Sequence, residues 1–372
     1  MSTQKSILIL GAGFAGTTVA HLMKGKGFDI TVLEYDKVPG GGCRTRWIGG
    51  HPYTFGPRIF FSRDDEVNAC ISSLVKIRQF FTKSYTYVEK DSALYNYPLQ
   101  YSDLPKMPDY KQIEGELSER KGKTPSVNNF EDYWISAIGP SLYSKFVDDY
   151  SKKMWGIESN KNLSAEFEWV NRGTPIRDGD TRLYTDQFQG YPENEDGYNQ
   201  FFDKALAGVK YIPESKVEYF DWDRRVVHAS TGKFEADIIV NTLPVDYLFR
   251  LTYGKLQYCG RKFIPFVLPV SQALPDDATW IHYSGNETFT RITEFKKITT
   301  HKSPHTLLGM EIPDNQSRYY PVQSYSEKAR FQKYQEMFPK NFYSIGRHGS
   351  FKYKGIPDAI RDALDVKKQI LS

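Results

Sequence analysis

The feature that most constrains the fold is an apolar stretch near the start of the chain that runs into a glycine-rich turn. It reads SILILGAGFAG over Ser6–Gly16, and a second apolar run, ITVLEYD, follows at Ile30–Asp36. An apolar run that ends in glycines spaced GxGxxG predicts a buried strand, a tight turn and a helix, here over Thr17–Lys24. The second run predicts the neighbouring parallel strand, so the whole segment indicates a βαβ unit.

The glycines and the acid of this motif each have a physical reason for their position. Gly11 permits the tight turn, Gly13 lets a pyrophosphate approach the backbone, and Gly16 lets the helix pack closely on its strand. Glu34 lies 18 residues after Gly16, where an acid commonly binds the ribose hydroxyls. We therefore predict that the segment binds a dinucleotide; the alternative is a glycine-rich turn in an ordinary βαβ unit.

The composition argues against several classes of protein. The 372 residues include 49 basic and 45 acidic side chains, a net charge of +4, so we expect no nucleic-acid partner. The longest apolar runs are strand-sized and residues 1–5 contain no signal-peptide core, so we expect no membrane span. The cysteines, Cys43, Cys70 and Cys259, are odd in number and lack metal-ligand spacing, which favours a reducing cytoplasm and no metal site.

The pattern of apolar residues changes along the chain. Residues 64–155 show helical spacing, except that Tyr95–Lys123 holds several prolines and charges and is expected to be a loop. From Val217 onward the pattern is short and alternating, with strands expected at 279–283, 289–294 and 306–311. A strand before Gly346 and a helix at the end of the chain, Pro357–Leu371, indicate that the chain returns to complete the nucleotide domain.

These patterns predict an α/β protein in which a Rossmann-like nucleotide domain is interrupted by a helical lobe and an antiparallel β-sheet lobe. There is no second GxGxxG string, so we expect one bound dinucleotide, a flavin. The expected boundaries are 1–65, 205–250 and 330–372 for the nucleotide domain, 66–155 for the helical lobe, and 156–204 with 251–329 for the β-sheet lobe.

Several short strings, in order, add a more specific signal. They are GAGFAG with Glu34, the glycines 40–42, FGPRIFF at 55–61, YNYP at 95–98, FVDDYSKKMWG at 146–156, NRGTPIR at 171–177, LYTDQFQGYP at 183–192, FTRITEFK at 289–296, Glu311, YYP at 319–321 and GRHGSFKY at 346–353. Together these strings resemble the flavin-dependent UDP-galactopyranose mutases and cover nearly the whole chain.

The resemblance implies an FAD-binding Rossmann-like domain and a mutase that interconverts the pyranose and furanose forms of a nucleotide-diphosphate sugar. In that reaction reduced FAD supplies N5 as the nucleophile at the anomeric carbon, so the protein must hold the diphosphate, exclude water and stabilise charge. The resemblance also implies an external reductant such as NAD(P)H or a reduced flavin, a UDP-sugar as substrate, and a homodimer.

The resemblance assigns two catalytic arginines. Arg291 is implied to hold the leaving diphosphate, because an arginine fork binds phosphate bidentately; the structural alternative is an ordinary ion pair with Glu294 on the same strand. The second arginine is implied to lie on a mobile loop near 165–182, at either Arg172 or Arg177, because NRGTPIR carries one extra residue relative to the family string. Arg172 aligns with the family's first arginine, and Arg177 has the alternative of pairing with Asp178 or Asp180.

The resemblance also implies a set of substrate-binding aromatic and acidic residues. Tyr320 and Tyr353 correspond to tyrosines that donate to the diphosphate, and Tyr184 lies beside a third such position at Leu183. Phe146, Tyr150 and Trp155, at spacings of four and five on one expected helix, are implied to form the wall that stacks on the base; a core stripe is the alternative. Glu311 either positions the sugar or is a buried acid satisfied by a strand partner.

On the cofactor side, the resemblance places Arg347 at the pyrophosphate, Gly41 and Gly42 near ribose and phosphate, and the backbone of Val217 against the adenine. The full set of residues expected to contact FAD is Gly11, Gly13, Phe14, Ala15, Gly16, Glu34, Tyr35, Gly41, Gly42, Cys43, Val217 and Arg347.

Three departures from the family pattern concern the sugar. Arg58 stands where the family has a histidine beside the flavin, and it either favours an anionic reduced flavin or reaches an acidic part of another ligand. His282 aligns with an asparagine that faces the sugar. Gly355 stands where the family has an acid, and Asp358 replaces that acid only if the loop bends. The departures predict a sugar other than plain galactose: N-acetylated, deoxy or larger.

Two other functions fit a flavin-binding fold. One is an FAD-dependent amine oxidase or desaturase, which would consume oxygen, and the other is a catalytically inactive flavoprotein that binds a sugar nucleotide or a partner. The first is disfavoured by Arg291, Arg172, Tyr320 and Tyr353, which suit a diphosphate better than an apolar chain.

Overall fold

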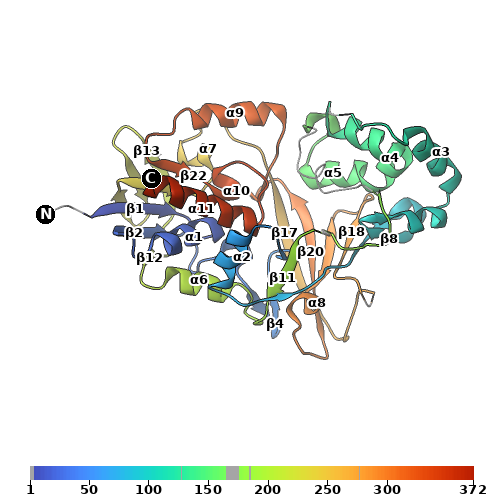
Figure 1. Ribbon diagram of the computed structural model, residues 1–372, viewed down its shortest axis with the longest axis horizontal. Coiled ribbons are helices and arrows are strands. Elements are labelled where there is room, and N and C mark those ends of the chain that lie inside the picture. The colour runs from blue at the N-terminus through green and yellow to red at the C-terminus, as the bar shows by residue number, and fades with distance from the viewer. Residues whose placement is uncertain (1–3, 127, 165–175, 184–185, 276) are drawn as a thin grey trace.

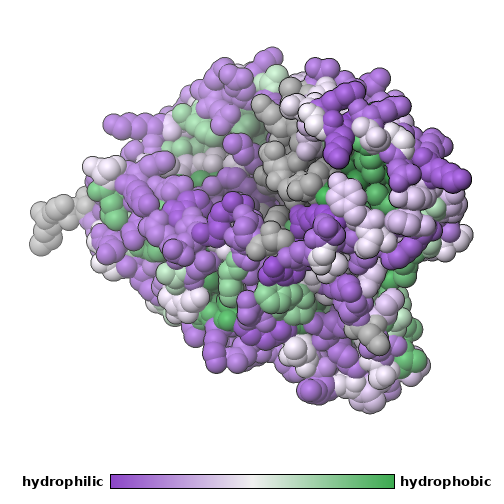
Figure 2. Space-filling view, turned by 45° about the vertical axis from the view of Figure 1, so that its right-hand side comes forward, coloured by the Kyte–Doolittle hydropathy of each residue, from purple (hydrophilic) through white to green (hydrophobic). Residues whose placement is uncertain are grey.

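The computed structural model describes residues 4–126, 128–164, 176–183, 186–275 and 277–372. Figure 1 shows a parallel sheet with its helices at one side of the molecule, a large sheet at the other, and a group of helices beside the end of the large sheet. The face drawn in Figure 2 is mostly hydrophilic, with small hydrophobic areas between the polar ones. No helix among the described residues is long and apolar enough to cross a bilayer.

The parallel sheet has five strands in the order β12-β2-β1-β16-β22. The first of these along the chain, β1, pairs with strands on both sides in parallel register. Both faces of the sheet are covered, which is why the strands in its centre read as apolar runs. The strands are β1 (Lys5–Leu10), β2 (Phe28–Leu33), β12 (Lys210–Ile212), β16 (Ile238–Asn241) and β22 (Phe342–Ser344).

Helices from the two ends of the chain pack together against this sheet. The first helix, α1 (Phe14–Met23), contacts the last, α11 (Ile356–Leu371), and also α6 (Asn199–Leu206). The predicted helix after the glycine motif, the predicted C-terminal helix and the predicted strand before Gly346 are all confirmed. The chain therefore returns to the first sheet at its end.

The large sheet has seven strands in the order β21-β17-β20-β19-β18-β7-β8. All neighbours are antiparallel except the parallel pair β18 and β7. The three strands expected from alternation are confirmed as β18, β19 and β20. The strands are β21 (Tyr320–Pro321), β17 (Tyr258–Leu268), β20 (Thr306–Asp314), β19 (Arg291–Glu294), β18 (Trp280–Tyr283), β7 (Ser84–Val88) and β8 (Ala93–Tyr97).

The helical group consists of α3 (Tyr110–Arg120), α4 (Phe130–Phe146) and α5 (Asp148–Trp155). The expectation of a loop over Tyr95–Lys123 is wrong, because this interval holds β8, the short strand β9 (Leu99–Gln100), a 3₁₀ turn and α3. Packing decides this segment: Ile113 of α3 is fully buried, and Arg120 Nε donates to the Ile135 carbonyl of α4 at 3.0 Å.

The expectation of one helix carrying Phe146, Tyr150 and Trp155 is also wrong. The chain breaks at Val147 (φ −121°, ψ −47°), so Phe146 ends α4 while the other two residues lie on α5. α4 itself is interrupted at Gly139, whose φ is +86° and which is followed by Pro140, a residue that cannot donate a helical hydrogen bond. The spacing along the sequence therefore does not translate into one helical face.

Two segments lie elsewhere than the expected boundaries indicate. The helix α2 (Asp65–Ser72) packs against α11 of the nucleotide side, where Arg361 forms ion pairs with Asp64 and Glu66. The strand β11 (Phe188–Pro192) pairs with β5 (Phe60–Ser62) and β6 (Ile77–Gln79) in a separate three-stranded sheet and does not join the large one.

The remaining short elements connect these layers. They are β3 (Arg46–Ile48), β4 (His51–Tyr53), β10 (Ile176–Arg177), β13 (Val217–Asp221), β14 (Val226–Ala229), β15 (Gly232–Glu235), α7 (Val245–Leu248), α8 (Lys296–Thr299), α9 (Tyr325–Gln335) and α10 (Gly346–Gly349).

Candidate functional site

The glycine-rich turn between β1 and α1 has the geometry that its spacing predicts. Gly11 has a φ of +99°, which side chains rarely adopt. A Cβ on Gly16 would lie 2.0 Å from the Gly11 carbonyl oxygen, so only glycine allows α1 to lie this close to β1. Among the described residues, no atom lies within 4 Å of where a Cβ on Gly13 would be. The turn is therefore closed at Gly16 and open at Gly13, as a phosphate-binding turn requires.

Glu34 lies at the end of β2, directly beside this turn. Its carboxylate accepts hydrogen bonds from the backbone N–H groups of Ala12 (2.6 Å) and Asp36 (2.9 Å). Burial raises the pKa of Glu34 above its ordinary value, and these N–H donors oppose that shift. Ser215 N–H donates to the Glu34 carbonyl at 2.7 Å, which brings the β13 segment that begins at Val217 beside the acid.

The other expected cofactor residues near the turn divide between the surface and the core. Tyr35 is 71% exposed. Phe14 and Ala15 are buried, and the Phe14 ring packs on Phe201 and Phe202 of α6. Cys43 is partly buried and packs against the same core.

A second glycine turn, residues 40–43, faces Arg58 and a tyrosine. A Cβ on Gly41 would meet no described atom within 4 Å, whereas one on Gly42 would lie 2.7 Å from the Tyr319 hydroxyl. Arg58 Nε donates to the Gly42 carbonyl at 3.3 Å, and the Arg58 guanidinium also donates to the Tyr319 hydroxyl. Tyr319 in turn donates to the Phe55 carbonyl at 3.1 Å. Arg58 is therefore tied to the backbone of this turn.

The large sheet carries a row of polar side chains on neighbouring strands. His282 of β18 is the register partner of Arg291 of β19, and Arg291 is the register partner of Glu311 of β20. Directly opposite residues in an antiparallel pair share one face of the sheet. Arg291 donates from Nε and Nη2 to the two Glu311 oxygens at 2.8 and 2.9 Å, a bidentate pair.

This pair is largely removed from solvent. The Glu311 side chain is 5% exposed and the Arg291 side chain 20% exposed. Burial alone lowers the pKa of the Arg291 guanidinium, but the Glu311 carboxylate reverses this and raises it above the ordinary value. The alternative pairing of Arg291 with Glu294 is wrong, because Glu294 is fully buried and accepts from Ala273, Leu274 and Thr306.

A second arginine beside Glu311 was missed from the sequence. The Arg261 side chain is 5% exposed, and its Nε lies 3.9 Å from Glu311 Oε2. Its guanidinium also lies over the Tyr320 ring, 5.2 Å from the centroid. Two cationic side chains thus share one carboxylate, which leaves one positive charge in excess. The alternating pattern of β17 does not single out Arg261, because the position of Arg261 beside Glu311 depends on the pairing of β17 with β20.

Aromatic rings gather next to these charges. Tyr320 and Tyr353 stack with centroids 5.2 Å apart and an interplanar angle of 17°. The Trp155 ring lies edge-on to both, at 6.1 and 6.3 Å. The Arg347 guanidinium lies over the Tyr320 and Tyr353 rings at 4.8 and 5.4 Å and donates to the Lys354 carbonyl. The structure therefore brings four of the expected residues together.

The base-stacking set is only partly brought together. Tyr150 and Trp155 belong to one apolar cluster with Tyr320 and Tyr353. Phe146 packs instead in the core of the helical group, with its ring 5.9 Å from that of Tyr95. The break at Val147 separates these two environments.

Of the three substrate residues expected between 172 and 184, the structure describes one. Arg172 and Tyr184 lie outside the described residues. Arg177 of β10 donates to the carbonyls of Arg182 (2.6 Å) and Leu183 (3.0 Å), whereas Asp180 is held by Arg182.

Asp358 accepts from the Gly355 backbone N–H at 2.7 Å. It therefore caps the start of α11.

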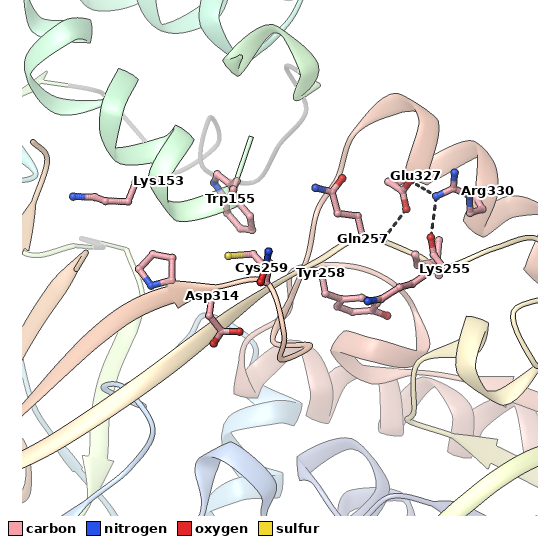
Figure 3. A pocket seen from close by; sticks show the side chains of 13 residues that line it. Lys153, Trp155, Lys255, Gln257, Tyr258, Cys259, Asp314, Glu327 and Arg330 are labelled. Carbon is pink, nitrogen blue, oxygen red and sulfur yellow. Dashed lines mark hydrogen bonds and ion pairs between the residues drawn. The ribbon is translucent and has the colours of Figure 1, made fainter. Parts of the chain in front are cut away.

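A cavity of about 590 Å³ borders the aromatic cluster. Figure 3 shows Trp155 at the end of α5 above Cys259 of β17, with α9 closing the far side. Two charged residues on that far side are paired with each other: Glu327 accepts from Arg330, and also from the Gln257 backbone N–H. Among the described residues, no three His, Cys, Asp or Glu side chains gather in a way that could hold a metal ion.

Comparisons with known proteins agree with this arrangement. A family model described as UDP-galactopyranose mutase matches residues 145–353, and one described as NAD(P)-binding Rossmann-like domain matches residues 9–74. The chain is 24% identical to dTDP-fucopyranose mutase of Escherichia coli over 96% of each chain. It is also 24% identical to "Probable UDP-galactopyranose mutase" of Klebsiella pneumoniae, over 99% of this chain and 95% of that protein. A crystal structure of reduced UDP-galactopyranose mutase superposes with a TM-score of 0.85, at 19% identity over 99% of this chain and 95% of the other.

Proposed function

This chain belongs to the UDP-galactopyranose mutase family, and from that premise we propose that it interconverts the pyranose and furanose forms of a nucleotide-diphosphate sugar with bound FAD. The observation that carries the proposal is the buried Arg291–Glu311 pair beside the cluster of Tyr320, Tyr353 and Arg347. Convergent cationic and tyrosine donors at the edge of a dinucleotide-binding fold suit a diphosphate.

The residues around the glycine turns fit FAD. Gly13 and Gly41 leave open space beside the backbone, and α1 presents its N-terminal N–H groups there. Glu34, directly after β2, would accept from ribose hydroxyls with the lone pairs that its two backbone donors leave unused. Reduced FAD supplies the nucleophile for the anomeric carbon when bound. Arg58, anchored on Gly42, would add positive charge close to the flavin.

The substrate diphosphate would be held by the sheet face. Glu311 occupies the Nε and Nη2 edge of Arg291, so the opposite edge, which carries Nη1, faces away from Glu311 and can take phosphate oxygens. Glu311 thereby orients the fork and offsets part of its charge before substrate arrives. Tyr320 and Tyr353 would donate to the same phosphates, and either Arg172 or Arg177 would complete the site.

The remaining parts of the proposal concern the substrate and the partners. We propose a UDP-sugar other than plain galactose, because Arg58, His282 and Gly355 replace family residues and Asp358 is used as a helix cap. The aromatic wall of Tyr150 and Trp155 can stack on the base. We also propose an external reductant such as NAD(P)H or a reduced flavin, a homodimer, and a cytoplasmic location.

The test is turnover by the FAD-loaded protein after anaerobic reduction with dithionite, on a panel of nucleotide sugars, with pyranose and furanose forms separated by chromatography. Arg291→Ala should reduce turnover about 10²–10³-fold with full FAD content, because a charge-stabilising donor is lost. Arg224→Ala, at an exposed turn after β13, is the matched control and should match the wild type. Steady oxygen consumption with an amine and no furanose product from any sugar would overturn the proposal.

A further inference from the structure

His282 lies in the polar row of the large sheet, next to Arg291. The two residues are register partners on β18 and β19 and share one face of the sheet. Trp280, two residues earlier on β18, shares that face as well. The Arg291 guanidinium lies 5.7 Å from the centroid of the Trp280 ring. His282 therefore borders the group that we propose to hold the diphosphate.

Both ring nitrogens of His282 are engaged by protein side chains. Trp280 Nε1 donates to His282 Nε2 at 2.9 Å, and the Tyr150 hydroxyl lies 3.2 Å from His282 Nδ1. An indole N–H can only donate, so Nε2 must carry a lone pair. The imidazole is consequently neutral with its proton on Nδ1, and Nδ1–H donates to the Tyr150 oxygen. Trp280 thus fixes the tautomer of His282.

These two hydrogen bonds use both polar atoms of the His282 ring. The Tyr97 and Tyr150 rings lie against His282, with centroids 4.8 and 5.7 Å away. The ring edge that remains consists of carbon atoms, so His282 offers a ligand neither a donor nor an acceptor without breaking one of these two hydrogen bonds.

We propose that the sugar of this enzyme is a deoxy sugar, lacking a hydroxyl at the position that meets His282. The inference rests on the proposed function. A hydroxyl placed against the carbon edge would lose its hydrogen bond to water and gain none, at a cost equivalent to about a tenfold to hundredfold loss in kcat/KM. The pyranose ring uses O5 and the furanose ring uses O4, so the missing hydroxyl is at C2, C3 or C6.

The first experiment compares kcat/KM of the reduced holoenzyme for galactose and for its 2-deoxy, 3-deoxy and 6-deoxy analogues, each as UDP and dTDP derivatives. One deoxy analogue should exceed its galactose counterpart at least about tenfold. Equal or better turnover of galactose would overturn the deoxy assignment and leave the mutase function intact. No turnover of any nucleotide sugar would overturn both.

The second experiment tests the hydrogen-bond arrangement without turnover. Nitrogen-15 NMR of the histidine side chains, assigned by the signals lost in His282→Asn, should show the His282 proton on Nδ1 in the wild type. A proton on Nε2 would overturn the proposal. Trp280→Phe removes the indole donor, so the proton should redistribute and the preference for the deoxy sugar should fall by the same factor as in His282→Asn.

Trp47→Phe is the matched control for this series. Its indole Nε1 donates to Asp196 on an exposed part of the molecule, so the substitution also removes a tryptophan hydrogen bond. The His282 signals and the sugar preference should both stay as in the wild type. An equal change in Trp47→Phe and Trp280→Phe would show a general effect of losing an indole and would contradict the assignment.

Discussion

The glycine-rich turn on the parallel sheet and the polar row on the large sheet, the two regions that we propose to bind ligands, are built by different means. The turn uses backbone, with N–H groups at α1 and open space at Gly13. The row uses side chains that hold one another, as Arg291 and Glu311 do. A site made of backbone depends on a few glycines and is indifferent to most other substitutions. A site made of interlocked side chains can change its ligand when one member changes, as we propose for His282.

The largest expected effect comes from a substitution in the glycine-rich turn between β1 and α1. Gly16→Ala would place a Cβ 2.0 Å from the Gly11 carbonyl oxygen, so α1 must move off β1. We expect a loss of more than about 4 kcal/mol in the free energy of unfolding and no bound FAD. Thermal melting of the apoprotein and flavin absorbance after reconstitution measure both.

Gly13→Ala is the matched control for that change. Gly13 has a φ of −75°, and no described atom would contact the new Cβ within 4 Å. The apoprotein should therefore melt like the wild type while FAD binds more weakly, because the methyl group occupies the space of the pyrophosphate. Unchanged FAD affinity in Gly13→Ala would contradict the placement of the cofactor.

The next largest effect is expected from a substitution in the polar row of the large sheet. Glu311→Ala removes the partner of a largely buried guanidinium, and we expect a cost of about 3 kcal/mol in unfolding free energy together with lost turnover. Because Arg261 also lies beside Glu311, the triple variant Arg261→Met/Arg291→Met/Glu311→Leu removes all three charges and should regain most of that stability in urea unfolding, with turnover still absent. If the triple variant is as unstable as the single one, the buried charges are not the source of the cost.

The two regions also differ in how far the sequence predicts them. The glycine turn, α1 and Glu34 are adjacent in sequence, so spacing alone predicts their geometry. The polar row depends on strand register, and register pairs residues that are distant in sequence. For that reason Arg261 was missed and Glu294 was weighed as the partner of Arg291.

Helix boundaries failed for a related reason. The break at Val147 and the helix α3 depend on packing between α3, α4 and α5, and apolar spacing within one segment does not report on that. The family resemblance named His282 and Arg291 as neighbours of the substrate, but the tautomer of His282 follows only from the position of Trp280.

A smaller effect concerns His348, which follows Arg347 on α10 between the two regions. Burial lowers the pKa of His348 to about 4, with Arg347 and Arg318 adding to the shift, and its Nε2 has no hydrogen-bond partner among the described residues. The unfolded chain, with a pKa near 6.5, binds the proton first, so stability is full above pH 6.5 and falls as the pH drops towards 4.

Because the two pKa values differ, protonation of His348 in the unfolded chain should lower the unfolding free energy of the wild type by about 2 kcal/mol between pH 7 and pH 5. His348→Gln cannot titrate and should lose less over the same interval. Urea unfolding at the two pH values measures this. Equal losses in the two proteins would show that His348 is protonated as easily in the folded as in the unfolded chain.

The smallest effect concerns Asp358 and tests whether the substrate site extends beyond the large sheet. Asp358 accepts from the Gly355 N–H at the start of α11, so Asp358→Ala should cost about 1 kcal/mol in unfolding free energy. Asp358→Asn keeps a capping oxygen and should cost less. Because the carboxylate is used as a cap, the relative kcat/KM for the sugars of the panel should not change in either variant. A changed sugar preference in both variants would mean that Asp358 contacts the substrate, and the substrate site would then extend from the large sheet onto the nucleotide side.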